Sequence, residues 1–227
     1  MMRRLVVALV AVLAALLLIG CGSSSSSTDP SKAMQTAKAA LDATAGVHVS
    51  ITSSGVPSGQ DGLTSAEGFL TRSPAAFKGT GKGSFQGFTA SVSATAIGGK
   101  IYATLPVVGT QTFSPSDLGF PDPSQLLNPD TGISSLLLKT KSLASGGQAR
   151  TGTNNDVIVT TYTGTLSSDD LTKVLPVQSG TFQVSYQIDG SGKLVGATVT
   201  GPFYKGSTST YTITLDQYGT APAITAP

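Results

Sequence analysis

The order of apolar and polar positions divides the chain into a leader, a tether and one folded domain. Residues 5–19 are an apolar run, and residues 22–29 after it are mainly serine. From Pro30 the apolar positions recur with a helical period, and after Gly46 they alternate as in a strand. This order predicts four segments, namely a leader at residues 1–20, a tether at 21–30, a domain at 31–218 and a flexible tail at 219–227.

The domain begins with an amphipathic helix. Pro30 suits a first helical turn, and Gly46 is of the residue type that ends a helix. Between them, one face carries Met34, Ala37, Leu41 and Ala45.

Two further helices are expected later in the chain. An apolar stripe predicts a helix over residues 133–144, with Asp130 or Thr131 as its cap and Gly146-Gly147 as its end. A shorter helix should begin at Ser167 and run to Val174 before Pro176.

The remaining apolar positions alternate and predict about eight to ten antiparallel strands. The predicted strands are residues 47–52, 63–72, 75–85, 88–97, 100–105, 157–165, 180–188, 193–201 and 208–215. Residues 113–134 contain four prolines and should form turns and helical stubs. Strand runs with separate helices indicate an α+β fold in which the helices cover one face of a strongly curved sheet.

One predicted strand carries a row of glycines. Gly79, Gly81 and Gly83 share one face of residues 75–85, and lysine and hydroxyl side chains occupy the other. Glycine weakens a strand unless another group must come close to its backbone. Two interpretations are open. The row forms a smooth channel for a ligand, or it relieves crowding where the sheet bends.

Composition excludes several classes of function. The 14 basic and 12 acidic residues include Arg3 and Arg4 in the leader, so 12 of each sign remain in residues 21–227. A neutral domain lacks the basic field that nucleic acids require. Charged residues make up only 11% of the chain, tryptophan is absent and Cys21 is the one cysteine. No disulfide, metal site or cofactor is therefore expected.

The leader ends in Leu18-Ile19-Gly20-Cys21, which looks like a bacterial lipobox. In such a motif the cysteine is linked to a diacylglyceryl group and becomes the new N-terminus. The alternative is an uncleaved anchor helix with an incidental cysteine. The apolar run of residues 5–19 is shorter than the roughly 20 residues that a spanning helix needs. We therefore expect lipidation at Cys21 and a protein held on the outer face of the cell membrane.

Several local patterns resemble catalytic motifs and fail on inspection. Asp130-Thr131-Gly132 matches the aspartic-protease tripeptide, but only one copy is present and that chemistry needs two carboxylates. Residues 79–84 lack the glycine and hydroxyl spacing of a phosphate-binding loop. His48 is the one histidine, and no Gly-x-Ser-x-Gly sequence accompanies it. We expect His48 to face solvent, with no catalytic residue in the chain.

Two stretches resemble a known family. Lys-Ile-Tyr-Ala-Thr-Leu at residues 100–105 and Asp-Pro-Ser-Gln-Leu-Leu-Asn-Pro-Asp-Thr-Gly-Ile at residues 122–133 are similar to the actinobacterial lipoproteins LppX, LprA, LprF and LprG, and most of all to LprG. The resemblance implies a half-barrel whose concave face holds helices and encloses an apolar cavity, as in LolA and LolB. It also implies binding and transfer of acylated envelope lipids, such as lipoglycans, phosphatidylinositol mannosides or triacylglycerol, with a membrane efflux transporter as a possible partner.

Together with the alternation, this resemblance assigns a set of cavity-lining residues. They are Val49, Ile51, Phe69, Gly79, Gly81, Gly83, Phe88, Tyr102, Ile133, Leu136, Leu137, Val159, Phe182, Val184, Tyr186 and Ile213. Because the faces are assigned by alternation alone, a slip of one residue would reverse a whole strand.

Three functions remain open from the sequence. The first is a membrane-anchored carrier that moves multi-acylated lipids or lipoglycans from the cytoplasmic membrane toward the outer envelope. The second is a structural or adhesive envelope lipoprotein with a filled core. The third is a lipid esterase that uses His48.

Overall fold

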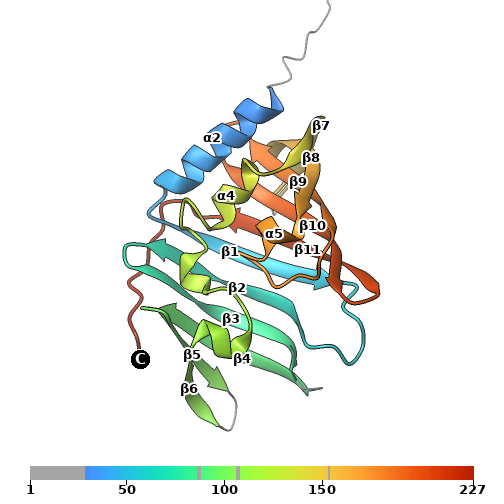
Figure 1. The fold of residues 1–227 in the computed structure, drawn as a ribbon. Helices are drawn as coiled ribbons and strands as arrows, with labels where there is room; N and C mark the ends of the chain where they lie inside the picture. The colour runs from blue at the N-terminus through green and yellow to red at the C-terminus, as the bar shows by residue number, and fades with distance from the viewer. Residues whose placement is uncertain (1–28, 86–87, 106–107, 153) are drawn as a thin grey trace, which may run out of the picture.

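The computed structural model describes residues 29–85, 88–105, 108–152 and 154–227 (Figure 1). The predicted leader, Cys21 and residues 21–28 of the tether lie outside these ranges. In chain order the elements are α2 (Pro30–Ala43), β1 (Gly46–Ser54), β2 (Gly62–Arg72), β3 (Ala75–Phe85), β4 (Phe88–Ile97), β5 (Lys100–Leu105), β6 (Gly109–Phe113), α3 (Pro115–Leu118), the 3-10 helix η2 (Pro123–Gln125), α4 (Ile133–Leu137), β7 (Lys141–Thr151), β8 (Val157–Ser167), α5 (Ser168–Leu171), β9 (Thr181–Asp189), β10 (Leu194–Tyr204) and β11 (Ser207–Asp216).

The strands form one antiparallel sheet of eleven, in the order β6-β5-β4-β3-β2-β1-β11-β10-β9-β8-β7. Every pair joins strands that follow each other in the chain, except β1 with β11, which joins the two halves. The edge strands β6 and β7 are not paired with each other, so the sheet stays open. It bends around α2, α4 and α5 (Figure 1), and we call the side that holds these helices the concave face.

Helix α2 is held at both ends. The Asp29 side chain accepts a hydrogen bond from the Ser31 backbone N–H at 2.9 Å and caps the start. At the other end the Arg72 guanidinium donates to the Leu41 and Thr44 carbonyl oxygens at 3.0 and 3.1 Å. The helix ends at Ala43, two residues before the predicted Ala45, because Thr44 is already extended and Gly46 begins β1.

The predicted helix over residues 133–144 is wrong beyond Leu137. Residues 141–151 form β7 instead and pair with β8 through two register shifts. The predicted cap is also wrong, since Gly132 is the N-cap residue of α4 and makes no side-chain bond. The Asn128 side chain accepts from the backbone N–H groups of Asp130 and Thr131, so the turn before α4 depends on Asn128.

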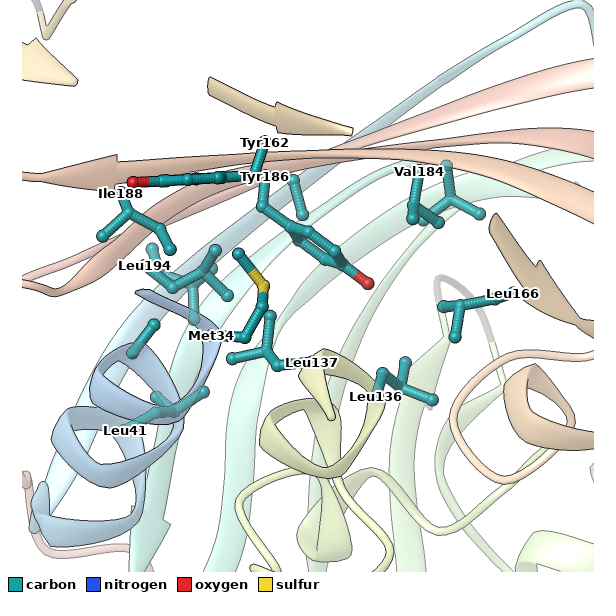
Figure 2. Packing of buried hydrophobic residues seen from close by; sticks show 14 of the residues in the cluster. Met34, Leu41, Leu136, Leu137, Tyr162, Leu166, Val184, Tyr186, Ile188 and Leu194 are labelled. Carbon is teal, nitrogen blue, oxygen red and sulfur yellow. The ribbon is translucent and has the colours of Figure 1, made fainter. Parts of the chain in front are cut away.

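The hydrophobic core lies between the helices and the strands of the second half of the sheet. Met34 and Leu41 of α2 and Leu137 of α4 are at most 1% exposed. They pack against apolar side chains of the concave face (Figure 2), which include Tyr162, Leu166, Val184, Tyr186, Ile188 and Leu194. The core therefore fills the concave face over β8–β10 rather than leaving it empty.

Residues 219–227 form no helix or strand, although they contact the domain. The Gly219 N–H donates to the Gly46 carbonyl oxygen at 2.9 Å, and Ile224 is only 4% exposed. That this tail is flexible stays a prediction. The burial of Ile224 argues against it. Among the described residues, no helix has the length and apolar character to cross a membrane.

Candidate functional site

The register of the sheet shows which side chains share the concave face, because directly paired residues point to the same side. Val47, Leu70 and Phe77 stand side by side across β1, β2 and β3, and all three belong to the core or pack against it. The next row toward the far end of the strands is Val49-Gly68-Gly79-Ala94-Ala103, and the one after it is Ile51-Ala66-Gly81-Val92.

This face is almost free of charge. In β1–β5 and β8–β11, Arg72 is the one charged residue whose register position, among the described residues, falls on the concave face. Its guanidinium is already bound to the carbonyl oxygens of α2. The opposite, outer face carries His48, Glu67, Lys78, Lys82 and Asp216. The concave face is therefore suited to apolar contacts, whereas the charged outer face is suited to contact with water.

Part of the concave face is not covered by the helices. Several apolar or glycine positions on it are only partly buried, and we call six of them the apolar strip, namely Ile51, Leu63, Ala66, Gly81, Val92 and Ile213. Ile133 of α4 is also partly buried and packs against the core beside the helices. The apolar strip continues the core toward the end of β1 and the start of β11 without introducing a charge.

Several hydroxyl groups near this face have partners within the protein, whereas the buried Ser207 Oγ has none among the described residues. The hydroxyl groups of Tyr204 and Tyr211 form a hydrogen bond of 2.9 Å, and the Ser53 hydroxyl donates to the Leu63 carbonyl oxygen at 2.6 Å. The Tyr186 and Thr140 hydroxyls are 2.8 Å apart, and burial raises the pKa of Tyr186 to about 12. Burial therefore keeps the Tyr186 hydroxyl protonated at neutral pH.

The glycine row has two different explanations within one strand. A Cβ atom added at Gly79 would collide with the Glu67 carbonyl oxygen, and one added at Gly83 would lie 2.5 Å from the Gly62 carbonyl oxygen. Close approach of β2 therefore accounts for these two glycines. At Gly81 the nearest atom to an added Cβ is Leu63 Cδ1 at 3.5 Å, which is an ordinary contact. Crowding therefore does not account for Gly81, and its part in a ligand channel stays a prediction.

Most of the predicted lining residues lie on the concave face or in the core. Val49, Leu136, Leu137, Phe182, Val184 and Tyr186 are buried in the core, while Ile51, Ile133 and Ile213 are partly buried beside it. The side chain of Phe88 lies outside the described part of the structure. Whether any of these residues contacts a lipid stays a prediction.

Three predicted lining residues point to the outer face, and this is a correction. Phe69 pairs with His48 and Lys78, and its ring lies 5.0 Å from the His48 ring. The neighbouring Leu70 takes the core position, being 0% exposed. In the sequence Gly-Phe-Leu-Thr either apolar residue could have pointed inward, so alternation alone could not choose between them.

Tyr102 and Val159 are corrected for the same reason. Tyr102 pairs with Thr95, one position away from the core pair Ala96 and Ile101. Val159 has the opposite register parity to Tyr162 along β8, so it lies on the other side of the sheet, where it is nevertheless buried at 1% exposure.

Sequence reasoning missed the polar contacts that hold α4 against α2. Lys38 Nζ donates to Asp42 Oδ2 at 2.6 Å and to the Pro129 carbonyl oxygen at 2.7 Å. Ser134 Oγ donates to Asp42 Oδ1 at 2.6 Å. We call Lys38, Asp42 and Ser134 the helix clamp. The i,i+4 spacing of Lys38 and Asp42 was visible in the sequence, but its partners more than 90 residues away were not.

Two other features give little support to a chemical site. His48 lies on the outer face, with Nδ1 2.8 Å from Asp216 Oδ1. Its neighbours are therefore a carboxylate and the aromatic ring of Phe69, and not a nucleophile.

A depression of about 140 Å³ lies between η2 and the ends of β2 and β3, lined by Thr71, Arg72, Ala75, Ser124, Gln125, Leu127, Asn128 and Pro129. It is smaller than the roughly 300–1,000 Å³ of ordinary ligand pockets. Within the described ranges no three potential metal-binding side chains come together.

Known structures share this architecture. LprF from Mycobacterium bovis superimposes with a TM-score of 0.69 at 15% sequence identity, covering 87% of this chain and 96% of LprF. LppX from Mycobacterium tuberculosis gives a TM-score of 0.62 at 18% identity, covering 86% of this chain and 98% of LppX. At these identities the likeness shows the fold, an open antiparallel sheet with few helices.

The sequence is also similar to a characterised relative. The lipoarabinomannan carrier protein LprG of Mycobacterium tuberculosis (strain H37Rv) is 26% identical over 234 residues, which cover 99% of this chain and 95% of LprG. LprG of Mycobacterium bovis (strain AF2122/97) matches equally well. The family model described as LppX_LprAFG lipoprotein matches residues 29–225, and the chain therefore belongs to the LppX/LprA/LprF/LprG lipoprotein family, as residues 100–105 and 122–133 indicated.

Proposed function

We propose that this protein is a membrane-anchored lipid carrier that binds acylated lipids on its concave face and moves them from the cytoplasmic membrane toward the outer envelope. The observation that carries the proposal is the apolar strip, an uncharged and partly uncovered surface next to the core. The family relation supports it, since the relative LprG is a lipoarabinomannan carrier.

Burial of acyl chains supplies the binding free energy. Each CH₂ group removed from water contributes about 0.8 kcal/mol, so two chains can exceed the cost of ordering them. The apolar strip carries no charge that a lipid would have to desolvate, and the Ser53, Tyr186 and Tyr211 hydroxyls near it already have partners within the protein. Room for whole chains requires a cavity that opens between the apolar strip and α4, and this opening is part of the proposal.

The remaining parts of the proposal concern the anchor. A lipid on Cys21 would hold the protein at the outer face of the cell membrane, and residues 22–29 would give it reach. The cavity would then stay beside the bilayer that supplies its cargo. A protein without Cys21 should bind lipid but should deliver it poorly in the cell.

Mass spectrometry of co-purified lipids tests the proposal. Residues 29–227, which contain the whole sheet and its core, are expressed in an actinobacterial host and extracted with organic solvent. We expect multi-acyl lipids with the unmodified sequence and a strong reduction with Gly81→Trp, because the indole would occupy the apolar strip. Thr80→Trp is the matched control, since Thr80 is exposed on the outer face of the same strand.

The outcomes separate the candidate functions. Lipid in the unmodified protein and in Thr80→Trp, but not in a folded Gly81→Trp, supports the carrier. Clean extracts and no binding of added lipid would support a structural or adhesive envelope protein with a filled core. Equal amounts of co-purified lipid in all three proteins would show that the apolar strip is not the binding surface. Circular dichroism and thermal unfolding check that each variant is folded.

A further inference from the structure

One end of the sheet carries apolar residues at and beside its hairpin turns. Val108 lies in the turn between β5 and β6 and is 64% exposed, which makes it the most exposed large apolar side chain among the described residues. Leu105, the last residue of β5, is half-buried. The β3–β4 hairpin ends in the pair Phe85 and Phe88. We call Phe85, Phe88, Leu105 and Val108 the hairpin lip.

The hairpin lip lies at the end of the sheet where the apolar strip is uncovered. Strands β1, β3 and β5 run in the same direction because each is antiparallel to the strand between them, so both hairpins lie at the end of β1 (Figure 1). Phe85 and Phe88 come four residues beyond Gly81 and Val92 of the apolar strip along the same two strands. The hairpin lip therefore continues the apolar strip to the end of the sheet.

Other turns of the sheet have the residues that turns favour. Glycine, proline and small polar residues predominate in turns because they supply the backbone conformations and local hydrogen bonds that a turn needs. Four turns follow this rule, namely Ser73-Pro74, Gly98-Gly99, Gly190-Ser191-Gly192 and Lys205-Gly206. At 64% exposure Val108 contributes little to the core, so its burial requires a surface outside the domain.

The chain around the hairpin lip is almost free of charge. Residues 83–116 contain one charged residue, Lys100, and it begins β5 at the opposite end of the strand from Leu105. The edge strand β6 has no charge, although four of its five residues are exposed. Edge strands that face water are usually protected by charged residues. Contact with a lipid bilayer favours the absence of charge, because charged side chains are costly to bury in hydrocarbon.

Charged residues flank the hairpin lip on the neighbouring parts of the sheet. Asp61, Lys82 and Lys205 lie toward this end, and all three are exposed. Long lysine side chains can keep their ammonium groups at the level of water and headgroups while apolar neighbours are buried. This division into an apolar end and a charged surround is typical of a segment that enters the surface of a membrane.

We propose that the hairpin lip inserts into the surface of the cell membrane, so that the bilayer meets the apolar strip at the end of the sheet. The partner is the lipid bilayer, and the contact is apolar. This inference rests on the proposed function and adds to it the end of the sheet through which lipid enters or leaves. Insertion should be shallow, about 5–10 Å below the headgroups, because only the hairpin ends are apolar all round.

Depth-dependent quenching of a single tryptophan tests the insertion, since the chain has no tryptophan of its own. The full-length, lipidated chain is reconstituted in phosphatidylcholine vesicles with bromine at a shallow or a deep position of one acyl chain, or with none. Val108→Trp reports on the hairpin lip. Lys100→Trp is the matched control, because Lys100 is also exposed and begins the same hairpin at the other end of β5.

A second reporter separates insertion of the lip from the affinity of the indole itself for the interface. Thr110→Trp, at an exposed position of β6, is combined with Val108→Leu or with Val108→Asp. The aspartate carboxylate would have to lose water in order to enter the bilayer, so it should withdraw the hairpin. Circular dichroism and thermal unfolding check that every variant is folded.

We expect Val108→Trp to be quenched, more by shallow than by deep bromine, and Lys100→Trp to remain unquenched. Thr110→Trp should be quenched with Val108→Leu and should lose most of that quenching with Val108→Asp. Equal quenching of Val108→Trp and Lys100→Trp would overturn the proposal, because the anchor or the indole alone would then explain the contact. Absence of quenching in Val108→Trp would overturn it as well.

The outcomes for the lip and for the carrier can be told apart. Co-purified lipid together with an unquenched Val108→Trp would overturn the membrane contact and leave the carrier function intact. Quenching of Val108→Trp together with clean lipid extracts would support the contact and refute the carrier function. An emission shift without quenching that appears only at high protein-to-lipid ratio would assign the lip to a second copy of the chain, and would overturn the proposal.

Discussion

Replacing Asp42 by alanine should destabilise the domain more than any other single change to a partly exposed carboxylate. Asp42 lies in the helix clamp, where one oxygen accepts from Lys38 and the other from Ser134. Its side chain is 24% exposed, and Ser134 is only 2% exposed. The change therefore leaves a buried hydroxyl without an acceptor at the contact between α2 and α4.

The magnitude follows from these contacts. A hydrogen bond to a charged group contributes about 1.5–3 kcal/mol, and the exposed half of the clamp, the Lys38 pair, contributes about 0.5 kcal/mol. Together they give a loss of about 3 kcal/mol in the free energy of unfolding. For a domain of this size that corresponds to a fall of about 6–12 °C in Tm.

Thermal and denaturant unfolding measure this effect, with Asp130→Ala as the matched control. Asp130 is exposed in the turn before α4, and it takes part in that turn through its backbone N–H. We expect its replacement to change stability by less than about 0.5 kcal/mol. In a double-mutant cycle, Ser134→Ala should recover about 1–2 kcal/mol of the loss caused by Asp42→Ala.

Two results would refute this reasoning. A Tm of Asp42→Ala within 1 °C of the unmodified protein would mean that the clamp is not maintained in solution. Strict additivity of Asp42→Ala and Ser134→Ala would mean that the two side chains do not interact.

Three other changes test separate parts of the structure. Leu137→Ala should lower the free energy of unfolding by about 3 kcal/mol because Leu137 is fully buried, whereas Leu138→Ala, at 53% exposure, should leave denaturant unfolding nearly unchanged. Gly79→Ala should destabilise through its collision with β2, and Gly81→Ala should not, so equal melting temperatures would contradict the crowding at Gly79. Burial raises the pKa of Tyr186 to about 12, so its stabilising effect is complete below pH 10 and is lost as pH rises toward 12. Urea unfolding between pH 9 and 11.5 should show a weaker alkaline loss for Tyr186→Phe, and identical slopes would refute the burial of this hydroxyl.

Where local alternation was strong, the sequence was sufficient to place the strands. Residues 75–85, 88–97 and 100–105 were predicted with the bounds of β3, β4 and β5. The turns between them are local as well, and Gly98 and Gly99 both have the positive φ of a tight hairpin. The alternation of side chains and the residues of the turns are both local, so these strands can be predicted without knowing any distant contact.

The edge strands could not be found in this way. The sequence of β6 is Gly-Thr-Gln-Thr-Phe and that of β7 is Lys-Ser-Leu-Ala-Ser-Gly-Gly-Gln-Ala-Arg-Thr, and all of their residues are exposed or half-buried. An edge strand with no buried face lacks the period-two signal, so the apolar stripe continuing from α4 made β7 look helical. Pairing with β8 decided its structure.

The sequence by itself determined the family and the strand-rich order of elements. Only the tertiary structure decided that Leu70 rather than Phe69 points inward, because register is a property of paired strands. It also decided that β2 crowds Gly79 and leaves room at Gly81. The helix clamp joins Ser134 to Asp42, which lies 92 residues earlier in the chain. Such contacts exist only once the sheet has bent around its helices, since no local pattern encodes the distance between two remote side chains.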